Sequence, residues 1–126
     1  MKIEHIAIWV KDLERMKTFY ETYFDAQANA LYHNPTKGFS SYFLHFKSGA
    51  RLELMHRTDI DHAAPRDRFG YAHIAFSLGS RVAVDQLTNR LEQDGYTRLD
   101  GPRLTGDGYY ESAFLDPEGL TIELTV

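Results

Sequence analysis

The sequence has 126 residues, of which 43% are hydrophobic and 25% charged, and this is the composition of one globular domain rather than of a disordered chain. The net charge is −4 and the Lys and Arg residues are scattered, so no basic surface for nucleic acid is expected. There is no cysteine, which excludes disulfides and leaves His, Asp and Glu as the only strong metal ligands. No apolar run could span a membrane and no signal pattern opens the chain, so we expect a cytoplasmic protein.

The first half of the chain predicts a strand, a helix and two further strands. Residues 2–10 alternate between two faces, which is typical of a strand. Residues 12–24 place apolar side chains at helical spacing, and Asp12 is a plausible N-cap. Two strand-like runs follow at 41–46 and 51–55, with a Lys-Ser-Gly turn between them that suits a hairpin.

The second half repeats this order. A strand is predicted at 71–78, followed by a helix that begins after Ser80 and stops at Gly95. Strands at 109–115 and 120–126 are joined by an Asp-Pro-Glu-Gly sequence that favours a type I turn.

Two landmarks recur at nearly one period. His5 and His73 are 68 positions apart, and Glu53 and Glu123 are 70 positions apart. Two separate residues that repeat in register indicate an internal duplication.

The segment between the repeats, residues 56–70, is polar and contains a proline, as linkers do. We therefore expect one domain over residues 1–126, with a first module at about 1–58, a linker at about 59–69 and a second module at about 70–126.

Strand alternation separates the predicted sheets into two faces. One face is apolar and should lie under the helices; its residues are Ile6, Ile8, Leu52, Leu54, Ile74, Phe76, Ile122 and Leu124. The other face carries the landmarks His5, Glu53, His73 and Glu123. Two imidazoles and two carboxylates suit a divalent ion such as Zn²⁺, Ni²⁺, Co²⁺, Mn²⁺ or Fe²⁺.

Each of these four residues, taken alone, could have a purely structural role. A histidine in a strand is often only hydrogen-bonded, and a glutamate in a strand often pairs with a cation. Repetition in register favours the ligand set instead. Candidate substrate-binding residues on the same pattern are Trp9, Arg51, Tyr71 and Tyr110. The remaining histidines are expected to be structural or exposed: His33, His45, His56 and His62.

Three stretches resemble the vicinal oxygen chelate superfamily, which includes glyoxalase I, bleomycin-resistance proteins and extradiol dioxygenases. They are HIAIWVKDLERMKTFYETYF, YAHIAFSL and FLDPEGLTIEL. The resemblance implies an α+β fold of two tandem βαβββ modules that form a curved mixed sheet around a metal-binding cavity. It therefore implies one more short strand in each module, near 28–33 and near 97–101.

The resemblance also implies a function. His5, Glu53, His73 and Glu123 match the family's metal-ligand positions, and four ligands resemble the glyoxalase I pattern. It implies a lyase or isomerase that acts on a small carbonyl or thiol-adduct substrate through an enediolate or enolate, with Ni, Zn, Co or Mn as cofactor. Glu123 is the expected base, with Glu53 as its repeat-related partner. A homodimer is the expected assembly.

Two alternatives stay open. A dioxygenase would hold Fe through three protein ligands, and a bleomycin-resistance-like protein would bind a small molecule without metal. The chain lacks the Asn-Trp-Gly segment that bacterial glyoxalase I has shortly after its second ligand, so the substrate is unassigned. Residues 106–108 could form a mobile loop over the site.

Overall fold

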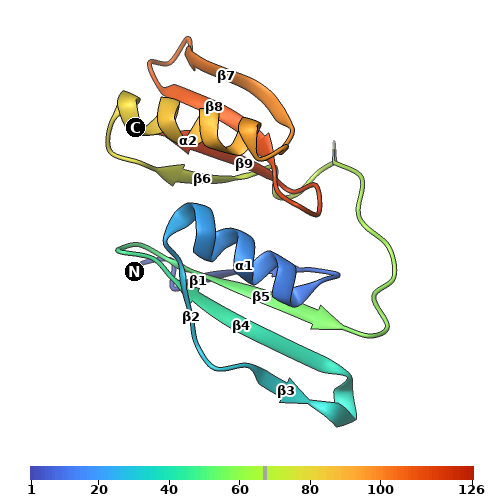
Figure 1. Cartoon of the computed structure of the whole chain (residues 1–126). Helices are drawn as coiled ribbons and strands as arrows, with labels where there is room; N and C mark the ends of the chain where they lie inside the picture. The colour runs from blue at the N-terminus through green and yellow to red at the C-terminus, as the bar shows by residue number, and fades with distance from the viewer. Residues whose placement is uncertain (67) are drawn as a thin grey trace. The chain divides into compact units, whose positions relative to one another are not determined.

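The computed structural model describes residues 1–66 and 68–126 and shows an α+β fold with two mixed sheets (Figure 1). The chain divides into two compact units, Met1–Ala63 and Ala64–Val126. Each unit has one sheet and one α-helix of its own. The assignment of 59–69 as a linker stays a prediction. No helix among the described residues has the length and apolar character needed to cross a membrane.

The first unit contains a five-stranded sheet in the order β1-β5-β4-β2, with β3 paired to β4. Strands β1 and β5 are parallel, and the other pairs are antiparallel. The elements are β1 (His5–Trp9), α1 (Leu13–Phe24), β2 (Gln27–Ala28), β3 (Tyr32–Asn34), the 3-10 turn η1 (Pro35–Lys37), β4 (Phe39–His45) and β5 (Arg51–Arg57).

The second unit contains a four-stranded sheet in the order β6-β9-β8-β7, in which β6 and β9 are parallel. Its elements are β6 (Ile74–Ser77), α2 (Arg81–Gln93), β7 (Arg98–Leu104), β8 (Tyr110–Leu115) and β9 (Thr121–Thr125). The additional strands implied by the family resemblance are present as β2 and β3 in the first unit and as β7 in the second.

Both helices begin at the residues predicted from the sequence. The Asp12 side chain accepts a hydrogen bond from the Arg15 amide at 3.0 Å, and the Ser80 hydroxyl accepts one from the Ala83 amide at 3.2 Å. Each cap pairs an amide that the first helical turn would leave unsatisfied.

The core of each unit lies between its helix and one face of its sheet. Leu52 and Leu54 on β5 and Ile122 and Leu124 on β9 are buried, as the alternation predicts. Their counterparts on β1 and β6 are only half-buried. β1 and β6 are edge strands of their sheets, and the single helix covers the edge less completely than the centre.

A tyrosine ties the helix to the sheet in the first unit. The Tyr42 hydroxyl on β4 donates to the Glu14 carboxylate on α1 at 2.5 Å, and the Lys17 ammonium lies 4.8 Å from the centre of the Tyr42 ring. This hydrogen bond and the nearby Lys17 ammonium hold the pKa of Glu14 below its ordinary value.

The second unit repeats this arrangement. The Tyr110 hydroxyl on β8 donates to Asp85 on α2 at 2.6 Å, and the Arg81 guanidinium lies 5.0 Å from the ring centre. Tyr110 follows Tyr42 by 68 positions, the same offset that relates His5 to His73. We call the two arrangements the tyrosine latches. Tyr110 therefore lies on the helix side of its sheet and not on the face predicted to bind substrate.

Strand β7 bends against β8 at Gly101. The register between the two strands shifts on either side of Asp100. Gly101 has φ +74°, and a Cβ atom added there would lie 2.3 Å from the Glu111 carbonyl oxygen. Only glycine permits this approach of the two backbones.

We expect Tyr42→Phe to lower the free energy of unfolding by about 1 kcal/mol at neutral pH, since it removes a hydrogen bond to a carboxylate. The difference from wild type should shrink as pH falls through the folded-state pKa of Glu14. That pKa is lowered, so the stability it contributes is present above the unfolded-state pKa and is lost once the folded carboxylate is protonated. Urea denaturation at several pH values measures this, and a difference that stays constant would contradict it.

We expect Gly101→Ala to destabilise the protein more than Gly95→Ala does. Both glycines have positive φ, so each substitution costs about 1–2 kcal/mol of left-handed strain. Nothing lies within 4 Å of a Cβ at Gly95, whereas Gly101 faces the β8 backbone. Equal midpoints of urea denaturation for the two variants would contradict this prediction, because they would show that β7 and β8 move apart at no cost.

Candidate functional site

The open face of the first sheet, opposite α1, carries His5 and Glu53. The register pairs His5 with Arg51 and Ala7 with Glu53, which places all four on one face. The His5 Nε2 atom lies 3.9 Å from a Glu53 carboxylate oxygen. The Glu53 side chain is only 14% exposed, so its carboxylate is held largely out of bulk water.

Glu4 orients the His5 ring. Its carboxylate accepts a hydrogen bond from His5 Nδ1 at 2.5 Å and also forms an ion pair with Arg51. The hydrogen bond from His5, together with Arg51, holds the pKa of Glu4 below its ordinary value. In a neutral imidazole that donates from Nδ1, the lone pair lies on Nε2, which is the atom that could bind a metal. Sequence reasoning missed this residue.

Arg51 supports the same corner of the sheet. Its guanidinium lies 4.2 Å from the centre of the Phe43 ring, and His5 meets that ring edge-on at 5.3 Å between centroids. The Arg51 Nε atom is buried and has no hydrogen-bond partner among the described residues. The structure thus gives Arg51, predicted as a substrate-binding residue, an orienting contact with Glu4.

The second unit places His73 beside Glu123. The His73 Nε2 atom lies 3.1 Å from a Glu123 oxygen, and the side chains are 41% and 21% exposed. Strand β6 is shorter than the strand predicted at 71–78. It begins at Ile74, and His73 lies just before it. Tyr71 is therefore outside the strand and is 85% exposed.

A third carboxylate, Glu111, lies on the same face as Glu123. The register pairs Ala113 with Glu123 and Glu111 with Thr125, so both glutamates point away from α2. Burial raises the pKa of Glu111, and the nearby Glu123 charge raises it further. The alternation of 109–115 could have identified this residue, but nothing in the first half corresponds to it.

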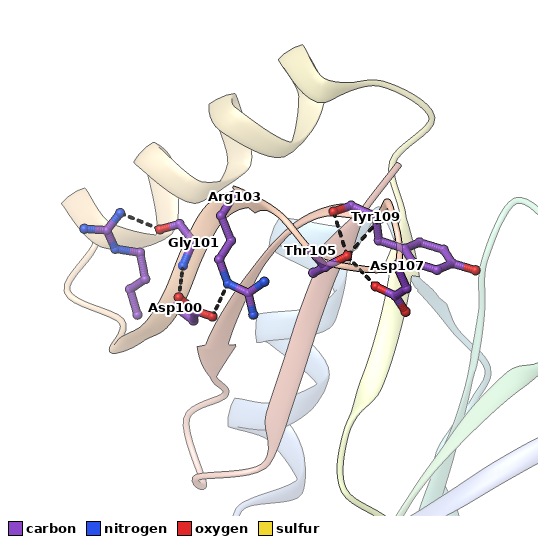
Figure 2. Close-up of polar contacts among 7 residues, drawn as sticks. Asp100, Gly101, Arg103, Thr105, Asp107 and Tyr109 are labelled. Atoms are coloured by element: carbon purple, nitrogen blue, oxygen red, sulfur yellow. Dashed lines mark hydrogen bonds and ion pairs between the residues drawn. The ribbon is translucent and has the colours of Figure 1, made fainter.

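Polar contacts fix strand β7 beside Glu111. Asp100 accepts hydrogen bonds from Arg103 at 2.5 Å and from the Gly101 amide at 2.8 Å (Figure 2). The bond from Arg103 lowers the pKa of Asp100. Arg103 pairs with Glu111 across the two strands, which places a cation beside that carboxyl group.

The turn after β7 is held by its own hydrogen bonds. The Thr105 hydroxyl donates to Asp107 at 2.6 Å and accepts from the Tyr109 amide at 2.9 Å (Figure 2). Backbone bonds join Thr105 to Tyr109 and to Gly108. The turn that was expected to be a mobile loop is thus an internally bonded hairpin end.

The other histidines have separate contacts. His33 bonds Ser40 at 2.8 Å, His56 donates to the Val10 carbonyl at 3.1 Å, and His62 pairs with Asp61. His45 is exposed at the end of β4.

Each unit thus supplies one imidazole nitrogen that faces one glutamate. Among residues 1–66 and 68–126, no group of three or more His, Asp or Glu side chains is close enough to hold a metal ion. The four residues predicted as ligands lie in the structure as two pairs, His5 with Glu53 and His73 with Glu123, and their role as metal ligands stays a prediction.

Comparison with known proteins identifies relatives over the whole chain. The chain is 28% identical to the uncharacterized protein YqjT of Bacillus subtilis over 97% of its own length and 96% of that protein. The structure of a possible glyoxalase from Bacillus cereus matches with TM-score 0.73 and 25% identity, covering 100% of this chain and 99% of the other. The trypanothione-dependent glyoxalase I of Leishmania major matches in fold with TM-score 0.80 and 22% identity, covering 99% and 86%.

The family model of the Glyoxalase/Bleomycin resistance protein/Dioxygenase superfamily matches residues 2–124. This match covers nearly the whole chain, and each of the two mixed sheets carries a His–Glu pair. The chain belongs to this superfamily.

Proposed function

We propose that the protein is a metal-dependent lyase or isomerase of the glyoxalase-like type. Its substrate would be a small carbonyl compound or thiol adduct that reacts through an enediolate or enolate. The observation that carries the proposal is the paired geometry, in which a histidine Nε2 faces a glutamate carboxylate in both halves.

The donor atoms fit a divalent metal. Two ligand atoms bound at about 2.1 Å to one ion lie about 3 to 3.4 Å apart. The His73–Glu123 distance of 3.1 Å meets this condition, and the His5–Glu53 distance of 3.9 Å needs only a small side-chain rotation. Imidazole and carboxylate donors without thiolate suit Ni, Zn, Co or Mn, and also Fe.

The metal, when bound, would supply Lewis-acid stabilisation of the negative charge that develops on substrate oxygen. The protein's own contribution would be proton transfer. Glu123 would take a proton from the carbon beside the carbonyl and return it to the neighbouring carbon, with Glu53 as the repeat-related alternative. Burial raises the pKa of the neighbouring Glu111 carboxyl group, and a raised carboxyl pKa is a common feature of sites for proton transfer.

Homodimerisation in the cytoplasm and the absence of nucleic-acid or membrane partners belong to the same proposal. They rest on the family resemblance and on the composition.

We expect untagged wild-type protein to contain about one Ni, Zn, Co or Mn per chain, by plasma mass spectrometry. The double variant His5→Ala, Glu123→Ala should lose it, because one donor is removed from each pair. The matched variant His62→Ala, Glu92→Ala removes one exposed histidine and one exposed glutamate and should keep it.

Metal content decides among the alternatives. Bound iron would favour the oxygen-using enzyme. No metal in wild type after supplementation, with both proteins folded by circular dichroism, would overturn the lyase proposal and leave a small-molecule-binding protein. A metal-loaded protein would be assayed for isomerisation of hemithioacetals and thioesters.

We expect Glu4→Gln to weaken metal affinity by about tenfold or more, as loss of a carboxylate behind a ligating histidine commonly does. The amide is a poorer acceptor for the His5 Nδ1–H group, so the ring is less firmly oriented and its Nε2 atom is less basic. Competition with a chromogenic chelator measures the affinity. Glu21→Gln, on α1 at the other face of the sheet, serves as the control, and equal affinities for the two variants would contradict the orienting role.

A further inference from the structure

The open face of the first sheet has a second feature, a hollow beyond the His5–Glu53 pair. It has a volume of about 280 Å³ and lies where β1, β3, β4 and β5 come together. Its lining residues are Trp9, Tyr32, Asn34, Lys37, Phe39 and Arg57. All belong to the unit Met1–Ala63.

Three aromatic rings form the apolar part of the hollow. Trp9 meets Phe39 edge-on with 6.2 Å between centroids, and Tyr32 meets Phe39 at 6.0 Å. Trp9 and Tyr32 remain 46% and 53% exposed, a large amount of ring surface to leave in water. The arrangement offers flat apolar surfaces on which a planar group could pack.

Two cations border these rings. The Arg57 guanidinium lies 5.1 Å from the Trp9 ring centre, and its Nε donates to Asp59 at 2.5 Å. Its terminal NH₂ groups have no partner among the described residues, and neither does the Lys37 ammonium. The hollow therefore has two positive groups with unused hydrogen-bond donors and one negative group, the Asp59 carboxylate.

Local structure holds Lys37 in this position. The Asn34 side chain accepts the Lys37 amide hydrogen bond at 3.2 Å and begins the 3-10 turn. The turn ends at Gly38, with φ +57°, where an added Cβ would lie 2.4 Å from the Thr58 hydroxyl oxygen. Thr58 follows Arg57 directly, and its amide donates to the Gly38 carbonyl, so the two backbone segments that carry the cations are joined here.

We propose that this hollow binds a small planar aromatic carboxylate. The ring packs among Trp9, Phe39 and Tyr32, and the carboxylate accepts hydrogen bonds from Arg57 and Lys37. A neutral molecule would leave the cations unsatisfied, and a flexible aliphatic acid would not cover the rings. Trp9 lies four positions after His5 on β1, about 13 Å away at the usual rise, so this site is separate from the proposed metal ligands.

The test uses benzoate as the probe, with benzamide as its neutral isostere and cyclohexanecarboxylate as its non-planar analogue. Trp9 is the only tryptophan in the chain, so its fluorescence, excited at 295 nm, reports occupancy, and calorimetry gives the dissociation constant. We expect saturable benzoate binding, about tenfold tighter than binding of either analogue.

Single substitutions then locate the site. Arg57→Gln and Lys37→Gln should each weaken benzoate binding about tenfold. Lys47→Gln removes an equal charge from the exposed turn between β4 and β5 and should leave binding unchanged. Trp9→Leu, followed by calorimetry, should weaken it as well, and circular dichroism checks that each variant is folded.

Several outcomes would overturn the proposal. Equal binding of benzamide, equal effects of Arg57→Gln and Lys47→Gln, or no saturation would each do so. Loss of benzoate binding in the folded variant His5→Ala, Glu123→Ala would place the anion at the metal ligands instead. Retained binding there would leave the hollow intact even if the metal proposal fails. A monomer in sedimentation velocity for Trp9→Leu, against a dimeric wild type, would make the hollow an interface between copies.

Discussion

The two-sidedness of a β-sheet is the constraint on which the rest of this structure depends. Among residues 1–66 and 68–126 each unit has one α-helix, and that helix covers one face of the sheet. Because side chains alternate, burying Leu52 and Leu54 forces Glu53 to the other face, and burying Ile122 and Leu124 does the same to Glu123. The positions available for chemistry are thus a consequence of core formation.

The two open faces have become different in kind. Phe43 lies opposite Glu53 in the register, whereas Ala113 lies opposite Glu123. The first face carries aromatic rings and cations. The second carries Glu111 beside Glu123, with Arg103 across the strand pair from Glu111. The duplication therefore kept the His–Glu pair while the surroundings changed from stacking surfaces to carboxyl groups.

Much of the fold could be predicted from the sequence because it depends on local patterns. The N-caps Asp12 and Ser80 and the buried faces of β5 and β9 follow from spacing alone. Glu4 could not be found this way, because alternation over residues 2–10 assigns it to the face opposite His5. In the structure it precedes β1, and its side chain contacts the His5 ring. The hollow depends on the register of four strands, which no local pattern specifies. The hydrogen bond between Tyr110 and Asp85 joins residues far apart in the sequence, so no local pattern predicts it.

The tyrosine latches have a consequence for how this protein can change. Both lie on the helix side of their sheets, where they join helix to strand through contacts that no open-face residue shares. A substitution on an open face therefore leaves both latches in place. Selection on binding and selection on stability act on different sides of the same strands, and that is a physical condition under which one architecture can host unrelated reactions.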